Sequence, residues 1–174
     1  MISLANQLSC TTPVSLLVRK ARRLDLHGIG SFIQLASTRG CRHYHNPKNP
    51  PIIDPGLTKL TNTELTILLI SGENSYEPMA VRCAAQLARS SDINPTHLAT
   101  LAIRKKADRV LHHIATAGSK HDILGKVFWD AVIDKLPNQA TREEPHLPHW
   151  SRFVSIPGYQ RGRTSKPTWL IPSP

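Results

Sequence analysis

Cysteine, aromatic residues and long apolar runs are all scarce in this chain of 174 residues. The three cysteines, Cys10, Cys41 and Cys83, are too few and too scattered for a disulfide framework, so we expect reduced thiols. No apolar run approaches the roughly 20 residues that a membrane-spanning helix needs, so we expect no transmembrane segment. An aromatic content of 5% beside 14 prolines indicates a modest core and long irregular stretches.

The motifs of several large enzyme classes are also missing. The chain contains no Walker-type glycine loop, no GxGxxG, no GxSxG nucleophile elbow, no HExxH and no paired-cysteine zinc pattern. We therefore expect a non-catalytic protein with no cofactor and no small-molecule substrate.

One short stretch, residues 41–50, resembles a ligand cluster. Cys41, His43 and His45 have the spacing C-x-H-x-H, and thiolate and imidazole are good ligands for zinc or copper. A closed zinc site needs a fourth ligand, which nothing nearby supplies. We therefore favour an ordinary loop over a metal site.

Two other groups of ionisable residues could each be either a functional cluster or an ordinary polar surface. His146 and His149 lie near Glu143 and could form an acid–base cluster, but an ordinary polar turn explains them better. Asp130 and Asp134 are four residues apart on an expected helix, where two carboxylates could share a proton or a metal ion. Neighbouring lysines make a solvated charged face the better interpretation.

Acidic residues are few, and their distribution is uneven. The chain has 22 Lys and Arg against 12 Asp and Glu, a formal net charge of +10. Residues 1–50 contain seven basic residues and one acidic residue, and residues 138–174 contain five basic and two acidic residues. Between these segments, residues 51–137 are nearly neutral, with ten basic and nine acidic residues. Two basic ends around a neutral middle indicate segments that meet polyanions, or a targeting segment.

The pattern of prolines and apolar residues divides the chain into four segments. We predict a basic leader at 1–44, a proline-rich linker at 45–59, a helical domain at 60–137 and a proline-rich basic and aromatic tail at 138–174. The predicted fold class is all-α: a small body of four helices, paired as helical hairpins, with extended basic N- and C-terminal segments.

Helix signals mark the four helices of this body. They are expected at 61–72, 75–91, 94–118 and 121–137, and the stretch RKKADR at 104–109 could break the third into two. Thr61 and Glu64 form a predicted capping box, and Pro78 and Pro95 fall in first turns. On the last helix, the spacing predicts that the apolar face includes Ile123, Leu124, Val127, Phe128, Ala131 and Val132.

The C-terminal tail mixes basic and aromatic residues. Basic side chains there could contact phosphates, and aromatic rings could stack on bases. The alternative is that the aromatic rings cover the helical body while the arginines are only solvated. The predicted RNA-binding residues are Arg152, Tyr159, Arg161, Arg163, Lys166 and Trp169.

Residues 1–45 resemble a mitochondrial presequence. They are rich in arginine, serine and threonine, poor in acidic residues, and include a predicted basic amphipathic helix within 12–30. The stretch RHYH at 42–45 is similar to a matrix-processing site, with Arg42 two residues before the aromatic Tyr44. The resemblance implies cleavage after Tyr44 and a mitochondrial matrix location; a bacterial cytoplasmic protein is the alternative.

Together these features lead to two functional expectations. The first is a non-catalytic basic structural subunit of a mitochondrial ribonucleoprotein, with a ribosomal protein as the leading case. Its partners would be RNA, expected to be rRNA, and neighbouring protein subunits. The second is a helical protein–protein interaction module, bacterial or organellar, with no nucleic-acid role.

Overall fold

The computed structural model of this chain describes residues 15–72, 76–138, 146–155 and 166–173. These residues form a mostly helical fold with a single small antiparallel pair of strands, which confirms the all-α class. Seven α-helices occur in the described part of the chain, and five of them lie within residues 60–137, where the sequence predicted a body of four. None of the helices in these four ranges is long and apolar enough to cross a bilayer.

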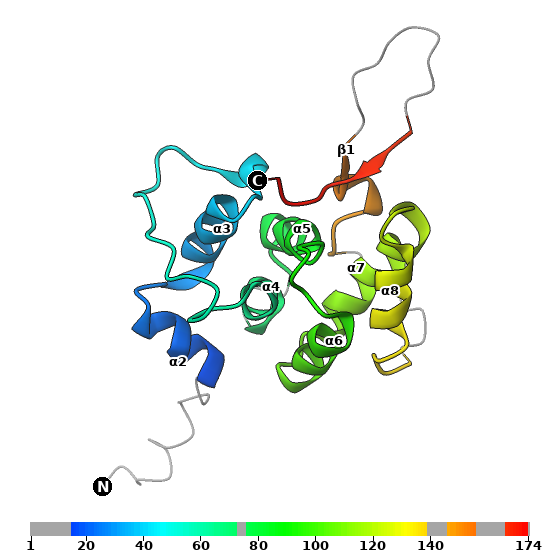
Figure 1. Ribbon diagram of the computed structural model, residues 1–174, viewed down its shortest axis with the longest axis horizontal. Coiled ribbons are helices and arrows are strands. Elements are labelled where there is room, and N and C mark those ends of the chain that lie inside the picture. The colour runs from blue at the N-terminus through cyan, green and yellow to red at the C-terminus, as the bar shows by residue number, and fades with distance from the viewer. Residues whose placement is uncertain (1–14, 73–75, 139–145, 156–165, 174) are drawn as a thin grey trace, which may run out of the picture.

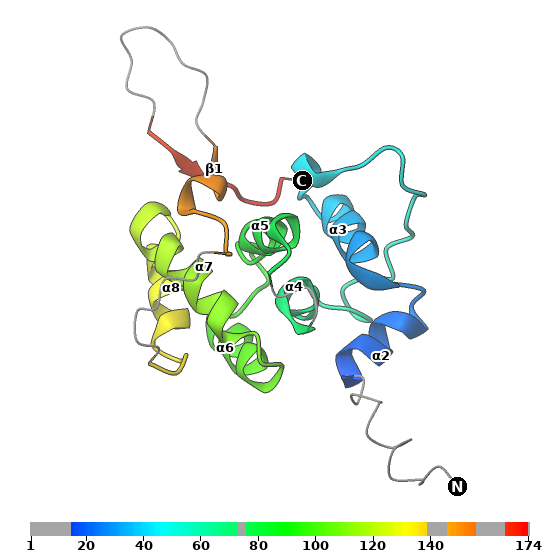
Figure 2. The same ribbon diagram turned by 180° about the vertical axis from the view of Figure 1, so that it is seen from behind.

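The helices form one arrangement around a central pair, α4 and α5 (Figure 1). Helices α2 and α3 lie on one side of this pair and α6, α7 and α8 on the other, as the view from behind also shows (Figure 2). The helices are α2 Leu16–Arg23, α3 Gly28–Thr38, α4 Asn62–Ile70, α5 Pro78–Leu87, α6 Pro95–Arg104, α7 Asp108–His121 and α8 Lys126–Ile133. The shorter elements are the 3-10 turns η1 Arg42–Tyr44 and η3 Trp150–Arg152 and the strands β1 Val154–Ser155 and β2 Thr168–Trp169.

Local signals place the ends of several helices where the sequence predicted them. The Thr61 hydroxyl accepts from the backbone N–H of Glu64, and the Glu64 carboxylate accepts from the Thr61 N–H, which confirms the capping box of α4. Pro78 and Pro95 occupy the first turns of α5 and α6. The predicted helix at 94–118 is broken into two within RKKADR, the alternative that the sequence left open, because Lys106 adopts a positive φ of 56° between α6 and α7.

Helix α4 is buried on almost every side. Of its residues, only Glu64 is not buried. A helix that is apolar around its circumference belongs in the interior of a fold, which matches the position of α4 between the two groups of helices.

The segment predicted as a leader packs on this central pair. The basic helix expected within 12–30 is the shorter α2, which ends before Asp25 with its φ of 59°, and a second helix, α3, begins at Gly28. Lys20 on α2 forms a salt bridge of 2.6 Å with Glu64 on α4. The buried hydrophobic side chains of this segment are those of Leu17, Ala21, Leu26, Phe32, Leu35, Ala36, Cys41 and Tyr44.

This packing bears on the predicted processing site. Tyr44 is buried in the core, whereas Arg42 is exposed. Cleavage after Tyr44 remains a prediction, and in the folded chain it would separate α2 and α3 from the helices on which they pack.

Helix α8 presents a different face to the core from the one predicted. Trp129 and Val132 are buried, whereas Ile123, Leu124 and Val127 are 77%, 90% and 82% exposed. The expected inward position of these last three residues is therefore wrong. The indole of Trp129 takes the interior position, and this rotation turns the neighbouring apolar positions outward.

Asp122 organises the corner between α7 and α8. Its carboxylate accepts hydrogen bonds from the Arg89 side chain at 2.6 Å, the Trp129 indole N–H at 2.9 Å and the Gly125 backbone N–H at 2.9 Å. Because Asp122 is almost completely buried, these three donors supply the polar partners that water would otherwise provide.

Two glycines allow this corner to close. A Cβ added to Gly118 would overlap the Trp129 indole, and a Cβ added to Gly125 would overlap the Asp122 carboxylate and the Arg89 side chain. Both positions therefore require the absence of a side chain, so that helix α7 can approach α8 closely.

Candidate nucleic-acid interface

The predicted RNA-contacting tail forms the base of a β-hairpin. Strand β1 pairs antiparallel with β2, with Val154 opposite Trp169 and Ser155 opposite Thr168. The chain between the strands, residues 156–167, contains several basic residues and no Asp or Glu. Of the predicted RNA-binding residues, Arg152, Lys166 and Trp169 belong to the described part, whereas Tyr159, Arg161 and Arg163 lie outside it.

Trp169 anchors the second strand in the core. Its side chain is only 3% exposed, and its indole N–H donates to the backbone oxygen of Ala85 on α5 at 3.2 Å. Its ring centroid lies 5.4 Å from those of both Trp129 and Phe153. In this arrangement the ring of Trp169 is not available to stack on a base, which is the role the sequence predicted.

Phe153 anchors the first strand beside it. The ring is 1% exposed and meets the His113 ring edge-on, with centroids 6.2 Å apart. The Phe153 backbone oxygen also accepts from the Leu170 N–H at 3.0 Å. Three aromatic side chains, Trp129, Phe153 and Trp169, thus hold the base of the hairpin against the helical body.

Two histidines of α7 fasten the segment that precedes β1. The His121 ring stacks on the Trp150 ring with centroids 3.8 Å apart and planes within 8° of parallel. His113 lies 2.8 Å through Nε2 from the Pro148 carbonyl oxygen, a contact that requires a proton on that nitrogen. Partial burial, followed by repulsion from Lys120 and His149, lowers the pKa of His121, which favours the neutral ring in the stack.

The last described residues pack against α5 and against the turn that follows α3. The Gln86 side-chain amide donates to the Ile171 carbonyl oxygen at 2.9 Å, and the Ser173 N–H donates to the Gly40 carbonyl oxygen at 3.0 Å. The C-terminal end therefore reaches the turn after α3, as Figure 1 also shows. Nothing in the local sequence pattern indicated these two contacts.

Charged side chains at the hairpin base are exposed and basic. Arg152 follows Trp150 in the turn η3, and Lys166 precedes β2 by two residues. Both side chains are exposed, so the described part of the hairpin presents cations to solvent next to the connection that contains Arg161 and Arg163.

Many carboxylates of the described residues are used within the fold instead. Four of them form salt bridges, in the pairs Lys20–Glu64, Arg39–Asp54, Arg89–Asp122 and Lys126–Asp130. Exposed basic residues remain on α2 and at the end of α6 with the turn after it, namely Arg19, Arg22, Arg23, Arg104 and Lys106. The charge that faces solvent is accordingly positive.

The pKa values of two carboxyl groups reflect these internal contacts. The hydrogen bond from Arg39 lowers the pKa of Asp54, against a smaller opposing effect of burial. Burial alone would raise the pKa of Glu64, but hydrogen bonds from Lys20 and Thr61 together outweigh it and lower the pKa. Both groups are therefore ionised at neutral pH and neutralise their partners.

The possible metal ligands of residues 41–45 are not brought together. Cys41 is buried, whereas His43 and His45 are exposed. Within the described ranges, no group of three or more His, Cys, Asp or Glu side chains is arranged to hold a metal ion. Asp130 accepts hydrogen bonds from Ser119 and Lys126, as expected of a solvated charged face.

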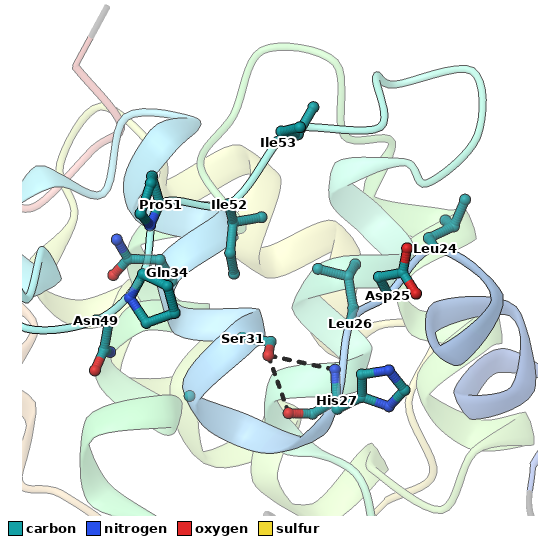
Figure 3. Close-up of a pocket in the computed structure, with 12 residues that line it drawn as sticks. Leu24, Asp25, Leu26, His27, Ser31, Gln34, Asn49, Pro51, Ile52 and Ile53 are labelled. Atoms are coloured by element: carbon teal, nitrogen blue, oxygen red, sulfur yellow. Dashed lines mark hydrogen bonds between the residues drawn. The ribbon is translucent and has the colours of Figure 1, made fainter.

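A pocket of about 550 Å³ lies between the α2–α3 turn, the first turns of α3 and residues 49–53 (Figure 3). Asp25 and His27 are the ionisable residues among those that line it. The Ser31 hydroxyl forms two hydrogen bonds with the His27 backbone: it donates to the carbonyl oxygen and accepts from the N–H (Figure 3). No hydrogen bond joins the side chains of Asp25, His27 and Ser31 in this lining, and His146 and His149 are not part of it.

Comparison with protein-family models, with curated proteins and with solved structures finds no match to this chain.

Proposed function

We propose that this chain is a non-catalytic basic structural subunit of a mitochondrial ribonucleoprotein, with the ribosome as the expected assembly, and that the β1–β2 hairpin contacts RNA. One observation carries the proposal. The buried side chains of Phe153 and Trp169 anchor the β1–β2 strand pair in the core, and the chain that connects the two strands, residues 156–167, is basic and contains no carboxylate. A basic segment that is anchored at both ends loses less conformational freedom on binding a phosphate backbone than a free tail of the same length would.

Within this proposal, the aromatic residues of the tail have two different roles. Phe153 and Trp169 hold the hairpin, whereas Tyr159 is the residue of the connection that could stack on a base. Arg161, Arg163 and Lys166 would contact phosphates, together with the exposed Arg152. The mitochondrial location rests on the composition of residues 1–45, whose basic residues all follow Ser15, and cleavage after Tyr44 is the processing step that goes with it.

Charge reversal in the connection tests the RNA role. In the full chain, the triple variant R161E/R163E/K166E is expected to bind single-stranded RNA about 100-fold more weakly at roughly 0.1 M salt. The slope of log K against log salt should fall in magnitude by about 2, because three phosphate contacts are lost. Filter binding or fluorescence anisotropy across a salt series measures both quantities.

The matched control reverses three exposed lysines away from the hairpin, K48E/K59E/K135E. It makes the same change in net charge and should retain most of the affinity and slope. Equal losses in the two triple variants would mean that the hairpin has no special role. An unchanged affinity in the hairpin variant would remove the RNA proposal.

A second function, a helical protein–protein interaction module, is favoured by the exposed side chains of Ile123, Leu124 and Val127. These three residues, which we call the α8 patch, lie close together in sequence, in the turn before α8 and in its first turn. Exposed apolar side chains gathered in this way are typical of interaction sites. This function is compatible with the first, since a ribonucleoprotein subunit also contacts proteins.

Charged substitutions in the α8 patch test this second function. The variant L124D/V127D is expected to lose the protein partners that the tagged chain retains after nuclease treatment in its native host. The stability of the chain should change by less than about 0.5 kcal/mol per substitution, because both side chains are exposed.

The control is I53D, which places a carboxylate on another isoleucine that is 91% exposed. It should keep the same partners as the unmodified chain, as judged by quantitative mass spectrometry. Identical partner sets for L124D/V127D and the unmodified chain would exclude the α8 patch as the docking surface.

A further inference from the structure

Two thiols from distant parts of the sequence meet in the core. Cys41 follows α3, Cys83 lies within α5, and both are completely buried. The Cys41 thiol lies 4.0 Å from the backbone oxygen of Cys83, to which it can donate. Both cysteines are free thiols in this structure.

We propose that Cys41 and Cys83 are a redox-active pair that forms a reversible intramolecular disulfide with a small diffusible disulfide as the oxidant. The covalent bond would join the end of α3 to the middle of α5. This site is independent of the hairpin and of the RNA proposal.

Backbone contacts hold Cys41 in position for this bond. The Cys41 N–H donates to the Ala36 carbonyl oxygen at 3.0 Å, and the Cys41 carbonyl oxygen accepts from the Tyr44 N–H at 3.0 Å. Cys83 is fixed by the helix that contains it. Since the Cys41 thiol already reaches the backbone oxygen of Cys83, the two cysteines are neighbours in the core, and the proposed bond requires no rearrangement of distant segments.

The surroundings of the pair are poor in water. Burial raises the pKa of Tyr44 to about 12, against the opposing effect of Arg82, so this phenol beside the thiols stays protonated. The interaction with the neighbouring Cys41 thiol, followed by burial, holds the pKa of Cys83 well above its usual range. Cys83 is therefore a poor first nucleophile, and Cys41 is the thiol expected to react first.

The reaction proceeds by two exchanges. The Cys41 sulfur, after losing its proton, attacks the small disulfide RSSR and forms a mixed disulfide, and the departing thiolate takes up a proton as RSH. The Cys83 sulfur then loses its proton and attacks the Cys41 sulfur, which releases the second RSH. Overall, two protein thiols are oxidised to one disulfide while RSSR is reduced to two RSH.

Access to the buried thiols requires the short turn η1 to move. Arg42 and His43, which follow Cys41 directly, are exposed, whereas Cys83 is enclosed within a helix. A local opening at η1 would therefore expose Cys41 before Cys83. This order agrees with the order of reactivity above.

The disulfide would close a loop between residues 42 positions apart. A cross-link of this span removes conformational freedom from the unfolded chain, so the oxidised protein should have a Tm higher by roughly 10 °C. It would also keep the N-terminal helices attached to the body after a cut at Tyr44.

The test refolds the full chain carrying C10S from denaturant in a glutathione redox buffer, so that burial does not limit access to the thiols. We expect a mass lower by two hydrogens, a Cys41–Cys83 peptide in non-reducing peptide mapping, and a Tm increase that dithiothreitol reverses. The controls C41A and C83A, each with C10S, should show no such increase. A chain that refolds with both thiols free in an oxidising buffer, or that retains glutathione on either cysteine, would overturn the proposal.

Discussion

Replacement of Asp122 by alanine is expected to lower the free energy of unfolding by about 3–5 kcal/mol, because it removes one partner of a buried ion pair. Arg89 would remain mostly buried without its carboxylate, and the Trp129 indole N–H would lose its acceptor. The Gly125 N–H would lose its side-chain acceptor as well. Urea denaturation followed by circular dichroism measures the change.

Two further variants separate the charge of Asp122 from its hydrogen bonds. Asp122→Asn keeps an acceptor oxygen and should lose less stability than Asp122→Ala. Asp134→Ala removes an exposed carboxylate at the end of α8 and should change stability by less than about 0.5 kcal/mol. A loss below about 1 kcal/mol for Asp122→Ala would mean that the corner can rearrange without its carboxylate.

The second large effect is expected at Trp169. Its replacement by alanine should cost about 3–5 kcal/mol, since it removes a buried indole packed against Trp129 and Phe153. The hairpin should lose its fixed position at the same time, because Trp169 is the buried residue of β2. Both effects follow from packing and require no contact between Trp169 and RNA.

Leucine at position 169 distinguishes anchoring from base stacking. Trp169→Leu keeps an apolar side chain in the core, so it should retain more stability than the alanine variant and bind RNA with nearly unchanged affinity. If the indole stacks on a base in the complex, the leucine variant would instead lose about 1–3 kcal/mol of binding energy. Anisotropy measurements well below the Tm of the variant decide between the two.

Signals within a few residues of one another were the part of the fold that the sequence could predict. The capping box of α4 joins Thr61 to Glu64, three positions apart, and each proline in a first turn acts on its own backbone. Such features require no knowledge of the tertiary structure. The all-α class followed from them together with the helical spacing of apolar residues.

The face that a short helix buries was harder to predict. The spacing of α8 allowed an apolar face containing Ile123 and Val127, but the structure buries Trp129 instead. The choice depends on Gly118 of α7 and on Asp122, which accept the large indole and satisfy its N–H. The size of Trp129 was the one sequence signal that could have favoured this orientation.

Contacts between distant segments were outside the reach of sequence pattern. The Trp169 indole bonds to Ala85 across 84 positions, and the Ser173 hydroxyl bonds to Gly40 across 133. The sequence pattern of α2 is that of a basic amphipathic helix, as found in leader segments, but its apolar side chains Leu17 and Ala21 are buried against the helical body. The periodicity of apolar residues predicts that such a face exists, but it does not identify the surface on which that face packs.

The corner between α7 and α8 also defines a pattern by which distant relatives of this chain could be recognised. Gly118, Asp122, Gly125 and Trp129 form the spacing G-x3-D-x2-G-x3-W, and each position has a steric or hydrogen-bonding reason. An arginine 33 positions before the aspartate completes the set. A sequence that keeps these five residues should keep the corner, even where the rest of its surface has diverged.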